Sequence, residues 1–295
     1  MIGIVLAAGK SKRMKSRVPK VALPMLGQPV VSYPIEAARR AGVKRILVIV
    51  AKNSPLVDMI DGVEFVIQPK PLGTGDAVKV ALRDIKRNEL ILILNGDNPL
   101  IRSRTIRRMY RRLKREKLSG ILLTTELSDP TGYGRIIRDE NGLIAAIIEE
   151  KNLKPLQRSI KEINAGVYIF RYQDLREALR RIRLNRKKKE YLLTDVILVM
   201  NRMGKRLASV KGSPEDALGI NTPEEFQQVA RIMKERIVRA LRRRGVVLAN
   251  PDTVEIEPSV RIGPGTTIGP YVSIRGETRI GAGTKIEPFV IIGDG

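Results

Sequence analysis

Two cationic side chains follow a short apolar segment at the N-terminus. Residues 2–8 are apolar and small, Gly9 comes next, and Arg13 and Lys20 follow within eleven residues. Small residues allow backbone N–H groups to approach a phosphate closely, and nearby cations neutralise its charge. Phosphoryl and nucleotidyl transfer need this neutralisation, because negative charge spreads over the non-bridging oxygens in the transition state. The segment is neither a Walker loop nor a dinucleotide fingerprint, since both glycine patterns are absent.

Composition limits the chemistry that is open to the chain. Its 295 residues include no cysteine and no histidine. These absences exclude disulfide bonds, zinc–thiolate sites, cysteine nucleophiles and a Ser–His–Asp hydrolase. A bound metal ion would therefore need oxygen ligands, which favours magnesium or calcium. Hydrophobic residues make up 43% of the chain, which is typical of a globular protein with one large domain or two ordinary ones.

The chain is strongly basic, with 55 Lys and Arg against 31 Asp and Glu and a formal net charge of +24. The basic residues gather at 104–117, 180–189 and 242–244. A nucleic-acid-binding protein has such runs, but aromatic residues are only 4% and tryptophan is absent, so surfaces for base stacking are scarce. We therefore interpret the runs as solvated faces and expect no nucleic-acid partner. High charge without Cys or His also fits a protein adapted to heat.

The sequence indicates no membrane partner. The N-terminal apolar run has no basic leader before it and is too short for a signal peptide. The apolar run at 46–51 is far below the roughly 20 residues that span a bilayer. We expect a soluble cytoplasmic protein.

Strand-like and helix-like segments alternate through the first 220 residues. We expect strands at 2–8, 45–51, 63–67, 90–94 and 120–125, and helices at 29–41, 75–82 and 104–117. This alternation predicts an α/β fold, Rossmann-like, with a mostly parallel sheet and helices on both faces. Such sheets bind ligands beyond the carboxyl ends of their strands. Gly9 and Asp97 each lie just past a predicted strand, so we expect both at one crevice.

The C-terminal part carries a strict six-residue repeat. Isoleucine recurs every six residues from Ile256 to Ile292, and glycine follows it at 263, 269, 281 and 293. This period predicts a left-handed parallel β-helix in which the isoleucines point inward. A helix starting at Thr222-Pro223 and ending near Gly245 is expected to precede it. An open β-helix end normally continues or is capped, so we expect the chain to be a fragment of a longer one.

Several segments together resemble one enzyme family. They are LAAGxxxRM at 6–14 with Pro19-Lys20 after it, QPKPLGTG at 68–75, DPTGYGRI at 129–136, EEK at 149–151 and EINAG at 162–166. This ordered set resembles the bifunctional N-acetylglucosamine-1-phosphate uridylyltransferase/glucosamine-1-phosphate acetyltransferase family. The hexad repeat resembles the start of the acetyltransferase half, so the resemblance covers nearly the whole chain.

The resemblance implies an organisation and an activity. It implies a nucleotidyltransferase (pyrophosphorylase) domain at 1–222, a linker helix at 223–245 and a truncated left-handed hexapeptide β-helix at 246–295. The implied reaction joins UTP and N-acetylglucosamine 1-phosphate into UDP-N-acetylglucosamine and pyrophosphate, with Mg²⁺ and in-line attack on the α-phosphate. A homotrimer formed through the β-helix, weakened by the truncation, is implied as well. Acetyl transfer is expected to be absent, because the family's histidine would lie beyond Gly295.

Residue roles carry over from the resemblance position by position. Leu6, Ala7, Ala8 and Gly9 would hold the nucleotide, and Arg13 and Lys20 would act as the catalytic cations on the triphosphate. Gln68 would read the edge of uracil, with Gly73 and Thr74 closing over the base. Asn95, Gly134, Glu149, Asn164 and Thr194 would bind the substrate around its sugar. Asp97 and Asn221 would bind Mg²⁺, and Asn221 would also contact substrate.

The sequence differs from the family pattern at a few positions. Ser11 stands where a second glycine is expected, and a positive φ there would strain it. Lys12 replaces a threonine and is expected to add a phosphate contact, while Asn95, Glu150 and Ala165 replace a common tyrosine, histidine and threonine. Two alternatives stay open: a related nucleotidyltransferase that uses another sugar 1-phosphate or dTTP, and a non-catalytic regulator or basic nucleic-acid binder.

Overall fold

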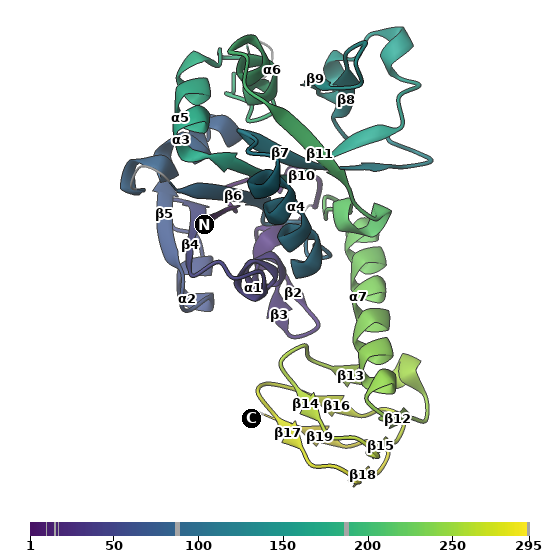
Figure 1. The fold of residues 1–295 in the computed structure, drawn as a ribbon. Helices are drawn as coiled ribbons and strands as arrows, with labels where there is room; N and C mark the ends of the chain where they lie inside the picture. The colour runs from purple at the N-terminus through teal and green to yellow at the C-terminus, as the bar shows by residue number, and fades with distance from the viewer. Residues whose placement is uncertain (10, 15, 17, 86–88, 186–188, 294–295) are drawn as a thin grey trace. The chain divides into compact units, whose positions relative to one another are not determined.

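The computed structural model describes residues 1–295 except 10, 15, 17, 86–88, 186–188 and 294–295. The side chain of Lys12, for which a phosphate contact is predicted, also lies outside the description, as does the 186–188 part of the basic run. The chain forms two compact units (Figure 1). The first contains Met1–Ala22 and Val31–Gly219, and the second contains Leu23–Val30 and Ile220–Gly295. The division expected after residues 222 and 245 stays a prediction.

A mixed but mostly parallel sheet forms the centre of the first unit. Its strands lie in the order β11-β7-β10-β6-β1-β4-β5. Their bounds are β1 Ile2–Leu6, β4 Arg45–Ala51, β5 Glu64–Gln68, β6 Leu90–Asn95, β7 Gly120–Glu126, β10 Glu162–Arg171 and β11 Leu207–Lys211. All neighbours along this path pair in parallel except β10, which runs antiparallel to β6 and to β7. An antiparallel pair, β8 (Arg135–Arg138) and β9 (Ile144–Ile148), attaches to β10. The predicted fold class is confirmed.

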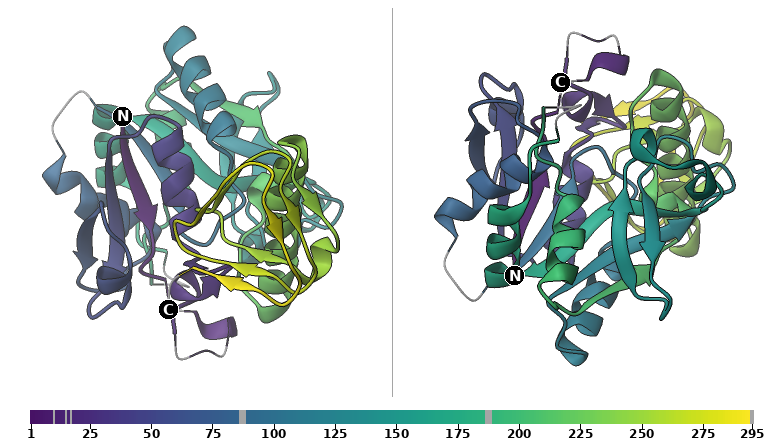
Figure 2. Two further views of the ribbon diagram at one scale, coloured as in Figure 1. Left: turned by 90° about the horizontal axis from the view of Figure 1, so that it is seen from below. Right: turned by 90° about the horizontal axis from the view of Figure 1, so that it is seen from above.

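Helices cover both faces of this sheet (Figure 2). One face packs against α1 (Ser32–Arg40) and α4 (Ser103–Arg115), and the other against α3 (Thr74–Ala81), α5 (Tyr172–Arg181) and α6 (Asp195–Arg202). Short turns complete the unit: α2 Leu56–Met59, η1 Lys12–Met14, η2 Lys20–Ala22, η3 Leu82–Asp84, η4 Glu150–Asn152, η5 Pro155–Gln157 and η6 Pro214–Ala217. Alternate residues of each strand enter the two cores, as Val5 and Ile4 of β1 do. This two-sided burial explains why the central strands are apolar throughout.

The helix expected at 29–41 begins later than predicted. Gln28–Pro29 is a short strand, β3, that pairs with β2 (Pro24–Met25), and α1 starts only at Ser32. The turn between them places Leu26 and Gly27 at positive φ. An edge strand tolerates proline, because the missing N–H would have no partner on the open side of the strand. Pro29 therefore lies in a strand and not in the first turn of a helix.

The second unit contains a long helix and a short parallel β-helix. The helix α7 spans Pro223–Arg243, and a capping box closes its start: Thr222 Oγ1 accepts from the Glu225 backbone N–H at 3.2 Å. The strands are β12 Val247–Leu248, β13 Glu255–Ile256, β14 Arg261–Ile262, β15 Thr267–Ile268, β16 Ser273–Ile274, β17 Arg279–Ile280, β18 Lys285–Ile286 and β19 Ile291–Ile292, with η7 (Pro251–Thr253) before β13.

The hexad isoleucines end these strands, as the repeat predicts. Strands one coil apart pair in parallel, so that Ile256 lies beside Ile274 and Ile274 beside Ile292. Ile268 and Ile274 are completely buried. The expected hexapeptide β-helix is therefore confirmed as a short parallel one. In the described part of the chain, no helix is both long and apolar enough to cross a membrane.

Candidate active site

The loops after β1 and β6 lie side by side at one edge of the sheet. Leu6 of β1 is in register with Asn95 of β6, and the Gly96 N–H donates to the Leu6 carbonyl at 2.9 Å. A Cβ on Gly96 would lie 2.9 Å from that same oxygen, so the close approach requires glycine. Ala7 continues β1 by donating its N–H to the Ile49 carbonyl at 2.8 Å. These contacts position Asp97 beside the end of β1.

Lys20 and Asp97 form an ion pair at this edge, between Nζ and Oδ2. Their side chains are 15% and 22% exposed, so the pair is largely shielded yet open to an incoming ligand. The Lys20 backbone N–H donates to Ser11 Oγ at 2.7 Å. The serine that replaces the expected glycine thereby fixes the start of η2. Arg13 is exposed in η1, within the same loop, and Gly9 is exposed as well.

This edge of the sheet offers few protein ligands to a divalent cation. Among the described residues, no three acidic side chains gather into a metal-binding group. Magnesium is commonly held by one or two carboxylates together with water and phosphate oxygens, and the Asp97 carboxylate offers such a ligand. Asn221 belongs to the second unit, where its N–H donates to Glu225 Oε2 at 2.5 Å. Its predicted role as a ligand rests on the resemblance alone.

Gln68 ends β5 and is fixed by hydrogen bonds. Its Nε2 donates to the Gly73 carbonyl at 3.1 Å and to Asp76 Oδ2 at 2.8 Å, and the residue is 6% exposed. Neither a carbonyl nor a carboxylate can donate, so these partners set the orientation of the amide. The side-chain oxygen of Gln68, Oε1, is left as the group that can accept a hydrogen bond from a ligand.

The start of α3 is closed by residues 191–193. Gly73 adopts φ +98° and ψ 177°, and Gly75 donates its N–H to the Tyr191 carbonyl at 2.8 Å. Thr74 Oγ1 accepts from the Leu193 N–H at 3.0 Å. A Cβ on Gly73 would lie 2.6 Å from the Tyr191 carbonyl oxygen, so only glycine allows this approach. The predicted base-binding residues are thus held together by one loop.

Thr194 connects this loop to the predicted sugar-binding residues. Its hydroxyl donates to Glu149 Oε1 at 3.1 Å, and Thr194 is buried. Thr194 follows Leu193 directly, so the contacts of Thr74 and Glu149 meet at adjacent residues. The structure therefore brings the predicted base and sugar contacts into one continuous region.

Asn164 lies on β10 at a register shift between Asn164 and Tyr168. Its N–H donates to the Gly134 carbonyl at 2.9 Å, and its Nδ2 donates to the Tyr168 hydroxyl at 2.6 Å. Burial raises the pKa of Tyr168, and the negative charge of Glu149 raises it further. The hydrogen bond from Asn164 lowers the pKa by less, so the hydroxyl stays neutral. Gly166, at φ +71°, lies against Asn95: a Cβ there would come within 2.2 Å of Asn95 Nδ2.

Three side chains that the sequence analysis did not select support these residues. Asp76 holds Gln68, Tyr168 holds Asn164, and Arg135 pairs through Nη1 with Glu150 Oε2 at 2.8 Å. Arg135 is 2% exposed and also donates from Nε to the Ile160 carbonyl at 2.9 Å. Asp76 and Arg135 act through partners from other segments, and Tyr168 acts across a register shift within β10, so no local spacing indicates them. For Arg135, the sequence offers one signal, its charge beside the apolar pair Ile136 and Ile137.

Comparison with known families identifies the first unit. The model of the MobA-like NTP transferase domain matches residues 3–189. The chain belongs to this family. A second model, the bacterial transferase hexapeptide with six repeats, matches residues 254–295. The chain thus joins a nucleotidyltransferase-family domain to a hexapeptide repeat, as the sequence predicts.

Relatives agree with this assignment, and a solved structure shares the fold. The chain is 37% identical over 280 residues to "Bifunctional protein GlmU" of Caldanaerobacter subterraneus subsp. tengcongensis, covering 94% of this chain and 61% of that protein. It is 38% identical over 281 residues to a protein of that name from Thermus thermophilus, covering 93% of this chain and 61% of the relative. The predicted resemblance is confirmed, and the chain spans about three fifths of these relatives' length.

A crystal structure described as a glucose-1-phosphate thymidylyltransferase from Bacillus anthracis, in complex with a sucrose, shares the fold at a TM-score of 0.65. The likeness covers 79% of this chain and 95% of that one at 19% identity.

Proposed function

We propose that the chain transfers a uridylyl group from UTP to N-acetylglucosamine 1-phosphate and releases pyrophosphate. The observation that carries the proposal is the Lys20–Asp97 ion pair at the carboxyl ends of β1 and β6. A cation and a carboxylate held together at this edge supply charge neutralisation for phosphates and an oxygen ligand for a divalent ion. The GlmU relatives support the choice of substrates.

The chain's own residues would mainly bind and orient. The acceptor phosphate is already ionised at neutral pH, so its attack on the α-phosphorus needs no side-chain base. Lys20 and Arg13 would neutralise the triphosphate and the leaving pyrophosphate, beside the backbone of Leu6, Ala7, Ala8 and Gly9. Gln68 would accept a hydrogen bond from the base, next to Gly73 and Thr74. Glu149, Asn164, Thr194, Gly134 and Asn95 would orient the sugar.

We propose Mg²⁺ as the cofactor, with the Asp97 carboxylate of the first unit as its protein ligand, while the ligand role of Asn221 stays a prediction from the resemblance. When bound, the ion would neutralise phosphate charge and orient the triphosphate. The homotrimer through the β-helix is a further proposal that the hexapeptide match supports. A sedimentation measurement that shows only monomer would overturn it. The predicted absence of acetyl transfer stays a prediction.

The test is a pyrophosphate-release assay on Lys20→Gln, with Lys205→Gln as the matched control. Both lysines belong to the first unit and pair with an aspartate, Lys205 with Asp174 at 2.7 Å. We expect Lys20→Gln to lower turnover by about 100- to 1,000-fold, as loss of a charge-stabilising group does, and Lys205→Gln to leave it unchanged. Near-normal turnover in Lys20→Gln and in Arg13→Ala would overturn the assignment.

A substrate panel separates the proposal from its alternatives. UTP, dTTP and two other nucleotides are each combined with several sugar 1-phosphates, with and without Mg²⁺. We expect the highest rate with UTP and N-acetylglucosamine 1-phosphate, and none without Mg²⁺. Preference for dTTP or another sugar would support the related transferase, and no release with any pair would refute nucleotidyl transfer.

A further inference from the structure

A second cationic region lies on the first unit around α5. Two adjoining hollows of about 540 and 230 Å³ share Tyr172, Arg176 and Arg180 in their linings. The smaller hollow is also lined by Lys79 of α3 and Arg83 of η3. Four cationic side chains from two segments of the chain therefore border one concave surface.

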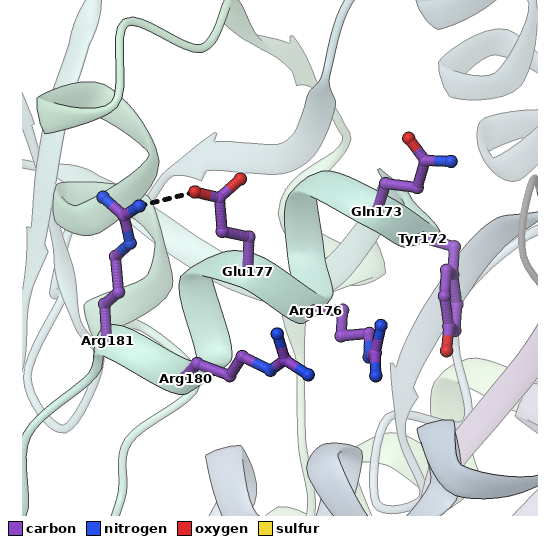
Figure 3. Close-up of a pocket in the computed structure, with 6 residues that line it drawn as sticks. All are labelled: Tyr172, Gln173, Arg176, Glu177, Arg180 and Arg181. Carbon is purple, nitrogen blue, oxygen red and sulfur yellow. Dashed lines mark hydrogen bonds and ion pairs between the residues drawn. The ribbon is translucent and has the colours of Figure 1, made fainter.

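The spacing of these residues makes them converge. Tyr172, Arg176 and Arg180 are four residues apart on α5 and share one face of the helix, away from the Arg181–Glu177 pair (Figure 3). Lys79 and Arg83 are likewise four residues apart. Tyr172 is buried and Arg176 is half-buried, while the other three cations are exposed. The hollow thus has an apolar floor and a cationic rim.

No carboxylate neutralises this rim in the part of the chain that the structure describes. Glu177 and Arg181 also line the larger hollow, but they pair with each other at 2.6 Å, and Asp174, the other carboxylate of α5, pairs with Lys205 at 2.7 Å. The hydrogen bond that Lys205 donates to Asp174 raises the pKa of Lys205, as expected for a paired cation.

Asp76 of α3 is likewise engaged, since it accepts from Gln68. None of the four rim cations has an ion pair or side-chain hydrogen bond among the described residues, and segments 86–88 and 186–188 contain only Lys, Arg and Asn.

A helix C-terminus attracts one solvated cation, but it does not account for four around one hollow. Like charges this close repel, and an anion between them relieves the repulsion. One guanidinium group can donate two parallel hydrogen bonds to a phosphate, which makes arginine the preferred partner of phosphate. The hollow is therefore arranged for a ligand with several negative charges.

We propose that this hollow binds a compact polyphosphate anion, either inorganic polyphosphate or the phosphate tail of a nucleotide. The concave shape favours a compact ligand over an extended one, and the burial of Tyr172 leaves no aromatic face on which a base could stack. The site is separate from the candidate active site. Thr74 is the first residue of α3, whereas Lys79 lies near the last residue of that helix and Arg83 lies beyond it.

The test is calorimetric titration with inorganic tripolyphosphate. An Arg13→Gln/Lys20→Gln background reduces binding at the candidate active site, and Arg176→Gln/Arg180→Gln is then added. The matched control adds Arg111→Gln/Lys114→Gln, two exposed cations of α4, for the same change in net charge. We expect the α5 pair to weaken binding by at least about tenfold, as loss of charge-assisted hydrogen bonds does, and the α4 pair by less than about twofold. The same variants in the otherwise wild-type chain give this comparison if the background fails to fold.

Separate arms identify the source of the anion. UTP that binds the background as tightly as tripolyphosphate indicates a nucleotide tail, and much weaker binding of UTP indicates inorganic polyphosphate. Equal weakening by the α4 and α5 pairs would overturn the proposal, since it would show general attraction to a basic protein. Absence of tripolyphosphate binding in the background, or tighter binding of an RNA oligonucleotide at the same residues, would overturn it too.

Discussion

Replacing Gly73 by alanine would strain the chain in two independent ways. The backbone at φ +98° and ψ 177° belongs to a region that only glycine adopts readily, which costs a side chain about 1–3 kcal/mol. The new Cβ would also lie 2.6 Å from the Tyr191 carbonyl oxygen and 2.8 Å from Glu190 Cβ. Backbone cannot yield as a flexible side chain does, and overpacking of this kind adds about 1–3 kcal/mol. Gly73→Ala should therefore lower the free energy of unfolding by roughly 4 kcal/mol, the sum of the two effects.

The substitution should also disturb the position of the Gln68 side chain, because the Gly73 carbonyl is one of the two acceptors of its amide. We therefore expect an increased KM for the nucleotide in the pyrophosphate-release assay. Gly204→Ala is the matched control: Gly204 has φ +68°, but its added Cβ would meet nothing within 4 Å. Only the left-handed conformation is then penalised, at about 1 kcal/mol, and KM should not change.

Urea unfolding measures the stability of both variants. Equal midpoints for the two variants, or an unchanged KM in Gly73→Ala, would refute this reasoning.

Three further predictions concern stability. In the β-helix, Ile274→Ala should cost about 3 kcal/mol because the side chain is completely buried, whereas Ile291→Ala, at 69% exposure, should cost well under about 1 kcal/mol; urea unfolding that shows similar costs would contradict the inward packing of the repeat. Arg135→Lys keeps the charge but loses hydrogen bonds to two backbone carbonyls, and should lower the free energy of unfolding by about 2 kcal/mol; an unchanged urea midpoint would show that these bonds contribute nothing. Burial raises the pKa of Glu162, but the hydrogen bonds with Arg138 and Thr124 and the charges of Arg138 and Lys211 together outweigh it, so the net pKa is lowered. Its stabilisation should therefore be present above the unfolded pKa of about 4.3 and be lost as pH falls through the folded value, so the advantage of wild type over Glu162→Gln should shrink in acid; an advantage independent of pH would argue against it.

The sequence predicted those parts of the fold whose pattern is local. Apolar runs mark β1, β4, β6 and β7 within a few residues, because strands buried on both faces are apolar throughout. The hexad isoleucines predicted the β-helix because each coil repeats the same inward position. The β2–β3 hairpin was missed because Pro29 suits a helix start as well as an edge strand. The antiparallel direction of β10 depends on long-range pairing, which no local pattern encodes.

The candidate site was predictable where residues follow strand ends. Lys20 and Asp97 come from different segments, yet both sit at the edge where parallel strands finish, and the structure pairs them. The supporting residues were not predictable in this way. Tyr168 reaches Asn164 only because β10 shifts its register between them, and Asp76 reaches Gln68 across the loop that leads into α3. Such contacts depend on the path of the backbone rather than on the spacing of residue types.

The two acceptors that occupy the Gln68 amide have a consequence for discrimination between pyrimidines. With both N–H bonds committed to Gly73 and Asp76, position 68 offers only lone pairs. The N3 atom of uracil or thymine carries a hydrogen and can meet that oxygen, whereas N3 of neutral cytosine carries a lone pair and would face it unfavourably. Rejection of CTP would then need no bulky side chain. Asp76→Asn would remove one of the two obligate acceptors and leave only the Gly73 carbonyl to hold the orientation of the glutamine, which should weaken the preference.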